Sequence, residues 1–275
     1  MRKCISLHSV EKGAKEEVPM RTVVALIKRY PLSAFFILAY ALSWLVYPLI
    51  QVSPIVGFVG LFGPALAAII VVAAVEGKRG LRDLMGRILQ WRVGVRWYVI
   101  ALGLPAVLAL VTAGMHLLLG APTPVALGQL SILEPILFVL VVGEEIGWRG
   151  YALPRLLATR SMLSASLILG VLWGAWHLPT FFIPGLPQHS IPFLAFMLLT
   201  IAYSVLFTWI YLRTAGSVLI ATVFHGSINF CQSFFLGGID PSREYWLLAF
   251  VWWVAALVVV VGTGTTFVRM PQNSP

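Results

Sequence analysis

Long runs of apolar residues, separated by short polar segments, dominate the pattern along this chain of 275 residues. A membrane-spanning α-helix needs about 20 consecutive apolar residues. The pattern predicts eight transmembrane helices, at 32–50, 55–75, 97–119, 132–146, 162–176, 191–212, 218–235 and 245–267. The fourth and fifth runs are too short to cross the hydrocarbon core, so we expect these helices to extend into the flanking polar segments.

The composition supports the same class of protein. Hydrophobic residues make up 60% of the chain and charged residues 11%, and the mean hydropathy is +0.93. These values lie far outside the averages of soluble globular proteins. The sequence therefore predicts an all-α, polytopic membrane helical bundle. We expect a polar cytoplasmic tail at 1–20, then a single transmembrane domain at 21–275 whose chemical motifs fall within 143–229.

The basic residues predict an orientation. If eight helices alternate, 18 of the 19 lysines and arginines lie on one side of the membrane and only Arg243 lies on the other. Loops rich in lysine and arginine stay cytoplasmic, so we expect both termini in the cytoplasm of a multi-pass protein of the prokaryotic inner membrane. The net charge of +9 then reflects topology and attraction to anionic membrane lipids, and indicates no nucleic-acid partner.

Two adjacent carboxylates, Glu144 and Glu145, follow an apolar run within the segment GEEIGWRG at 143–150. Ionisable residues inside a membrane are costly, which favours a functional role. Adjacent residues on a helix point about 100° apart, whereas residues four apart share a face. Glu145 is therefore predicted to form a structural ion pair with Arg149, which leaves Glu144 free to face a cavity. A purely structural charge cluster at a helix end is the alternative reading.

Polar groups recur in two further apolar helices. His225 and Asn229 are four residues apart and share a helix face, and Trp173 and His177 repeat this spacing. An imidazole and an amide on one stripe can bind a metal, orient a water or donate hydrogen bonds to an oxyanion. A lone intramembrane histidine more often serves helix packing. The recurrence of such groups beside a glutamate pair favours intramembrane hydrolytic chemistry.

These motifs resemble a known family of membrane peptidases. Glu144-Glu145-x-x-x-Arg149, the segment WGAWH at 173–177 and His225-x-x-x-Asn229, in this order on successive helices, are similar to the CAAX-protease and bacteriocin-processing (CPBP, or Abi) family. The resemblance covers 55–235 and includes, more weakly, the GPA segment at 63–65. The family usually carries phenylalanine where this chain has Trp173, so the shape of the pocket is expected to differ.

The resemblance implies peptide-bond hydrolysis within the bilayer. Carried over residue by residue, it implies that Glu144 and His177 activate the attacking water. It implies that His225 and Asn229 stabilise the tetrahedral oxyanion, whose hydrogen bonds are stronger where water is scarce.

The same resemblance implies supporting roles for Glu145, Arg149 and Trp173. It also implies a lipidated or hydrophobic peptide as the substrate, with prenylated CAAX proteins as the best-known example. Nothing in the residues selects one substrate of this class.

The sequence leaves the need for a cofactor open. Glu144, His177 and His225 are a plausible zinc set that leaves one coordination position for water. The same residues also support a mechanism without a metal. We favour the metal-free mechanism because asparagine is an uncommon zinc ligand, whereas it suits an oxyanion hole.

A second class of function is a non-enzymatic membrane protein, such as a transporter or a bacteriocin-immunity factor. Buried carboxylates and histidines also build proton relays in transporters. The sequence has no evident inverted repeat or matched pair of broken helices, which disfavours this class.

Simple alternation of helices raises one geometric conflict. Glu144 would lie near the cytoplasmic end of the fourth span, whereas His177 would lie about 22 Å along the fifth. The two side chains meet only if the fourth helix continues to about Arg155, before or across Pro154, or if it is broken or tilted beside a cavity.

Overall fold

The computed structural model describes residues 17–51, 59–120, 125–128 and 133–264, and most of these residues are helical. Within these ranges the only extended pairing is an isolated bridge between Ala126 and Gly237. The predicted all-α class is therefore confirmed.

The described residues contain six helices that are long and apolar enough to cross a membrane. They are α2 with its extension η1 (Pro31–Trp44 and Tyr47–Gln51), α6 (Val95–Leu118), α10 with its extension η3 (Met162–Trp176 and Leu178–Phe182), α11 (Phe193–Arg213), α12 (Val218–Phe235) and α13 (Pro241–Thr263). All six correspond to predicted spans, with ends that differ by a few residues. The short helix η4 (Pro187–Ser190) lies in the connection between α10 and α11.

The other two predicted spans take different forms. The second appears as α4 (Gly63–Val75), which has only 13 residues, while positions 55–58 of that span lie outside the described residues. The fourth is a broken helix made of α7 (Leu133–Leu140), α8 (Val142–Gly147), the π-helical turn η2 (Trp148–Ala152) and α9 (Leu153–Leu157). It extends past Arg155, as the geometric conflict in the sequence required.

Pro154 accounts for the irregular geometry of this broken helix. Proline has no N–H, so it cannot donate to the carbonyl four residues earlier. That carbonyl belongs to Gly150, and it accepts a hydrogen bond of 2.8 Å from the guanidinium of Arg87 instead. The preceding turn widens, because the N–H of Leu153 donates to the carbonyl of Trp148, five residues back. The helix therefore continues across the proline, and Arg87 supplies the missing donor.

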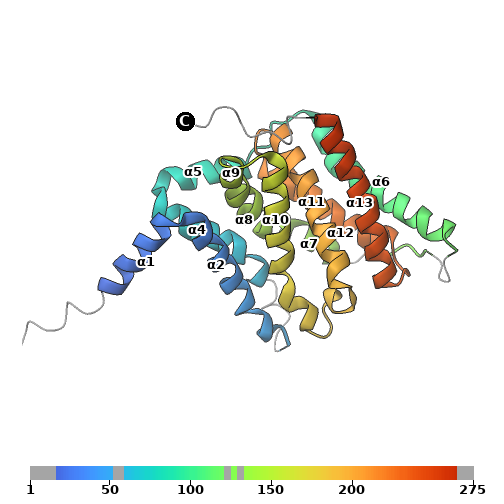
Figure 1. The fold of residues 1–275 in the computed structure, drawn as a ribbon, viewed down its shortest axis with the longest axis horizontal. Coiled ribbons are helices and arrows are strands. Elements are labelled where there is room, and N and C mark those ends of the chain that lie inside the picture. Colours follow the sequence, from blue (N-terminus) through green and yellow to red (C-terminus); the bar gives the residue numbers. More distant parts are fainter. Residues whose placement is uncertain (1–16, 52–58, 121–124, 129–132, 265–275) are drawn as a thin grey trace, which may run out of the picture.

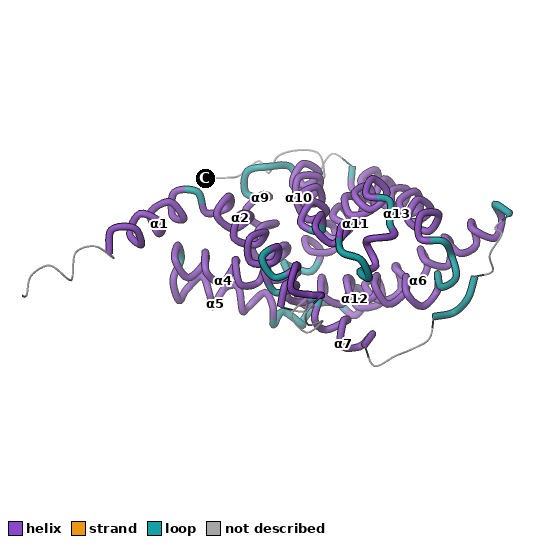
Figure 2. The backbone as a smooth tube through the Cα atoms, turned by 90° about the horizontal axis from the view of Figure 1, so that it is seen from below, coloured by secondary structure: helices purple, strands orange, loops and turns teal. Residues whose placement is uncertain are grey.

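Arg87 belongs to α5 (Gly77–Ile88), a helix between the second and third predicted spans that the apolar pattern did not predict. Gly80 and Leu84 are its buried positions. Within the expected polar tail, 17–20 begin helix α1 (Glu17–Arg29), while 1–16 lie outside the described residues. Figure 2 shows α1 extending away from the other helices. The division into a tail and one transmembrane domain stays a prediction.

The helices that carry the predicted motifs lie side by side in the middle of the bundle. Figure 1 shows α8, α10, α11 and α12 between α2 and α4 on one side and α6 and α13 on the other. Glycines allow two of these contacts to be close: a Cβ at Gly147 would overlap Pro64 of α4, and one at Gly170 would lie 2.7 Å from the Cα of Ile201 in α11. Gly147 and Gly170 therefore mark positions where two helices pack closely.

Candidate active site

Glu144 lies on α8, in the broken helix, and only 4% of its surface is exposed. Its Oε2 accepts a hydrogen bond of 2.8 Å from the indole Nε1 of Trp173, on α10. A buried carboxylate is stable only when polar partners replace its lost water. Trp173 provides such a partner and fixes the position of one carboxylate oxygen.

His177 is the C-cap residue of α10, one turn beyond Trp173. Its Nδ1 lies 2.9 Å from the carbonyl oxygen of Trp173. Because a carbonyl only accepts, Nδ1 carries the proton, and in the neutral ring Nε2 keeps a lone pair. The rings of Trp176 and Phe196 lie at 4.7 and 5.0 Å from the imidazole and restrict its rotation. Trp173 thus contacts both Glu144 and His177, which resolves the separation of about 22 Å that simple alternation gave.

Glu145 forms a second cluster beside the first. Its Oε1 accepts from the guanidinium of Arg149 at 2.8 Å and from the Nδ1 of His225, on α12, also at 2.8 Å. The contact with Arg149 was predicted and is confirmed. The contact with His225 was not predicted, because helix spacing shows only neighbours on the same helix.

Arg149 is fully buried, which differs from its expected place in a cytoplasmic connection. The π-helical turn extends the broken helix through this position, so that the side chain points into the bundle. Its guanidinium lies 4.2 Å from the ring centre of Trp173 and 3.6 Å from that of Phe207. Two aromatic faces and one carboxylate therefore compensate the buried charge.

His225 and Asn229 share one face of α12, as the spacing predicted, yet their surroundings differ. His225 is buried against Trp173 and Phe207, at ring distances of 5.3 and 5.8 Å. Asn229 lies one turn further along, and its side chain is exposed. Asn229 is therefore at the open end of the stripe, where an incoming molecule can reach it.

Comparison with known proteins agrees with this geometry. Residues 126–231 match the Type II CAAX prenyl endopeptidase Rce1-like family, and this segment contains all seven predicted site residues. The chain is also 28% identical over 193 residues to CAAX prenyl protease 2 of Methanococcus maripaludis, an alignment that covers 63% of this chain and 69% of that protein. Over this central segment the chain is therefore similar to the CAAX prenyl endopeptidase family.

The need for a metal stays open, as it was in the sequence. No group of three or more His, Cys, Asp or Glu side chains in the described part of the chain is arranged to hold a metal ion. The Nδ1 atoms of His177 and His225 are bonded to a carbonyl and to Glu145, and one oxygen of Glu144 is bonded to Trp173. These contacts fix the orientation of Glu144, His177 and His225, and they engage neither Nε2 of the two histidines nor Oε1 of Glu144.

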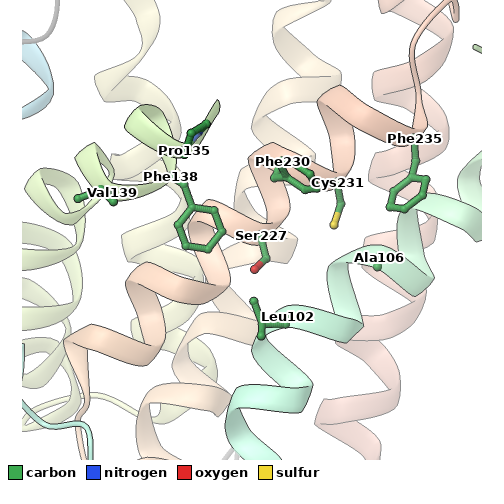
Figure 3. Close-up of a pocket in the computed structure, with 9 residues that line it drawn as sticks. All are labelled: Leu102, Ala106, Pro135, Phe138, Val139, Ser227, Phe230, Cys231 and Phe235. Carbon is green, nitrogen blue, oxygen red and sulfur yellow. The ribbon is translucent and has the colours of Figure 1, made fainter. Parts of the chain in front are cut away.

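A cavity of about 610 Å³ lies on another side of α12 and is distinct from this site (Figure 3). It lies between α6, α7 and α12, and apolar side chains such as Phe138 and Phe230 form most of its wall. Its one hydroxyl, Ser227, already donates to the carbonyl of Val223 at 2.7 Å. Ser227 is two residues from His225, so the two side chains point about 200° apart around the helix. The cavity and the Glu/His cluster are therefore separate candidate sites.

Two features of the Glu/His cluster were missed in the sequence. Trp173 was given only a supporting role, although its indole N–H donates to Glu144. Phe207 was not considered, although its ring lies against the guanidinium of Arg149. A buried indole N–H needs an acceptor, and this signal was present in the sequence. The contact of Phe207 has no local signal, because it joins two separate helices.

Proposed function

We propose that this membrane protein is an intramembrane CAAX-type endopeptidase in which Glu144 and His177 activate the attacking water. The observation that carries this proposal is the double role of Trp173, which holds Glu144 through its indole and His177 through its carbonyl. One rigid residue therefore fixes a carboxylate and an imidazole beside each other. Such an arrangement suits general-base catalysis.

In the first step, the oxygen of a water attacks the carbonyl carbon of the scissile peptide bond. A proton of that water passes to Glu144, while His177 orients the water through the lone pair on Nε2. The tetrahedral intermediate carries the negative charge on the former carbonyl oxygen. When it collapses, the C–N bond breaks and the proton held by Glu144 moves to the leaving amine, so that water is the only other reactant.

His225 and Asn229 are proposed to stabilise the oxyanion. The amide of Asn229 is exposed and donates directly. The Nδ1 proton of His225 is engaged with Glu145, so this ring donates from Nε2 only when it carries a second proton. Glu145 is the counter-ion of that charged ring, and Arg149 shares the same carboxylate oxygen. This gives Glu145 and Arg149 a supporting role.

The proposed substrate is a peptide with a lipidated or strongly hydrophobic segment. The relative from Methanococcus maripaludis is a CAAX prenyl protease by name. The proposed reacting groups lie among helices that are long and apolar enough to cross a membrane, which favours a membrane-embedded substrate. We therefore expect a prenylated CAAX peptide to be cleaved faster than the same peptide without its lipid.

The purified chain in proteoliposomes tests this function with prenylated and unprenylated CAAX peptides. Cleavage of the prenylated peptide by the wild type supports the proposal. Transport of a solute with both peptides intact would favour the transporter class instead. Metal analysis of the same protein adds a second test, since stoichiometric zinc whose removal abolishes activity and whose return restores it would contradict the metal-free mechanism.

The proposed orientation, with both termini in the cytoplasm of a prokaryotic cell, rests on the asymmetry of the basic residues. Reporter fusions to each terminus test it directly. Activity of a periplasmic reporter at either end would contradict this orientation.

A further inference from the structure

The last turn of α10, which carries Trp173 and His177, is tied to α2 by two side chains. The hydroxyl of Tyr40 donates to the carbonyl of Leu172 at 2.5 Å, and the indole Nε1 of Trp44 donates to the carbonyl of Trp176 at 2.9 Å. Carbonyls at the end of a helix lack donors within that helix. In a membrane they need other donors, since little water is present. The first span supplies such a donor to Trp176, next to His177, and adds a second hydrogen bond to Leu172 one turn earlier.

The same face of α2 also reaches the helix behind Glu144. Ser43 donates from its hydroxyl to the carbonyl of Gly60 at 2.7 Å, just before α4 begins. Pro64, in the first turn of α4, packs directly against Gly147 at the end of α8. Since α8 carries Glu144, α2 contacts α10 directly and α8 through α4. It is therefore a common support for both halves of the water-activating pair.

We infer that Tyr40 and Trp44 are positioning residues that set the place of His177 relative to Glu144. This inference rests on the proposed function, and neither residue is proposed to touch the substrate. Without the donor of Trp44, the carbonyl of Trp176 is unpaired and the last turn of α10 is free to shift. The ring of Trp176 lies 4.7 Å from that of His177, so such a shift moves the imidazole. Small displacements of a catalytic group reduce turnover strongly.

The chain offers a matched control for this tie. Trp253, on α13, donates from its indole to the carbonyl of Leu198 on α11, also at 2.9 Å. Trp44→Phe and Trp253→Phe therefore remove the same kind of hydrogen bond between two spans. Only the first variant removes a bond to the turn that carries His177. Tyr40→Phe is a milder companion, because it removes a single hydroxyl.

Activity is measured in proteoliposomes with a farnesylated CAAX peptide. We expect Trp44→Phe to lower kcat about tenfold while KM changes less than about twofold, because the reacting group moves and the substrate contacts stay. Tyr40→Phe should give a smaller loss in kcat in the same direction. Trp253→Phe should match the wild type in both constants.

A second measurement does not depend on activity. In protein with ¹⁵N-labelled indoles, the Trp173 resonance is identified by its absence in Trp173→Phe. This resonance reports the hydrogen bond to Glu144. We expect it to shift in Trp44→Phe and to keep its position in Trp253→Phe.

Equal losses of kcat in Trp44→Phe and Trp253→Phe would overturn the inference, because they would show a general effect on packing. Wild-type kcat together with an unmoved Trp173 resonance in Trp44→Phe would also overturn it. If Trp44→Phe does not accumulate in the membrane, Tyr40→Phe takes its place in the test. A lowered kcat and a shifted Trp173 resonance in Tyr40→Phe would then support the inference, and wild-type values of both would overturn it. A selective shift of the resonance in a protein that cleaves no peptide would support the positioning role while contradicting the proposed function.

Discussion

The two glutamates at the centre of the site are neighbours in sequence, yet their surroundings differ. Glu145 is fully buried, and a single oxygen accepts from both Arg149 and His225. Glu144 is slightly exposed and has one neutral partner, the indole of Trp173. One carboxylate is thus held by two cationic or ionisable groups, whereas the other keeps capacity to accept a further proton or hydrogen bond.

This difference separates a structural charge from a reactive one. A carboxylate neutralised by a buried guanidinium is a poor base, because protonation would strand the arginine. A carboxylate held by one neutral donor keeps its position and can still take a proton. The local contacts therefore divide the roles between residues of the same type, and each prediction below tests that division.

The largest expected effect on kcat is that of substituting Glu144. Glu144→Gln removes the base with almost no change in volume, so kcat should fall about 10²- to 10⁴-fold, the usual contribution of a general base. Thermal stability and membrane yield should stay near those of the wild type. Steady-state cleavage of a prenylated peptide, measured beside a melting curve in detergent, checks both expectations. Turnover close to wild type would remove Glu144 from the mechanism.

Substitution of Glu145 should lower stability as well as activity. Glu145→Ala leaves Arg149 buried without its carboxylate, at a cost of about 3 to 5 kcal/mol of folding stability. Melting temperature and membrane yield should therefore fall together with activity. Glu145→Gln is the control, because its amide oxygen still accepts one hydrogen bond. A stable but inactive Glu145→Ala, beside an active Glu144→Gln, would exchange the two roles.

The smallest expected effect is that of substituting Trp173, which lies between Glu144 and Arg149. Trp173→Phe keeps an aromatic ring near Arg149 and removes only the donor to Glu144. A hydrogen bond to a charged group contributes about 1.5 to 3 kcal/mol, so kcat should fall at least about tenfold without being abolished. The loss should appear in kcat more than in KM. Unchanged kinetics would show that Glu144 is held in place by other contacts.

Much of the fold followed from the apolar runs, because a helix must satisfy its backbone within the bilayer and the required length is fixed. The apolar runs did not predict the helix boundaries where the backbone geometry is irregular. Only 13 residues of the second span form α4, and the fourth is divided near Pro154. Hydropathy measures where lipid is tolerated, and it carries no information on how a proline's missing donor is replaced.

Part of the candidate site could also be predicted from the sequence, because helix periodicity shows which residues of one helix share a face. Spacing of four residues identified the contact between Glu145 and Arg149 and the shared face of His225 and Asn229. It did not identify the contact between His225 and Glu145, which joins α12 to α8. Contacts between helices depend on crossing angle and rotation, and these come from packing of the whole bundle.

The hydrogen bond between Arg87 and the carbonyl of Gly150 has a consequence for how such sequences vary. The arginine replaces a donor that Pro154 lacks, so the two positions serve one carbonyl. A relative with an ordinary residue at position 154 has its own N–H for that carbonyl and no longer depends on an arginine at position 87. We therefore expect these two positions, distant in sequence, to be exchanged together, and a double replacement to be tolerated better than loss of the arginine alone.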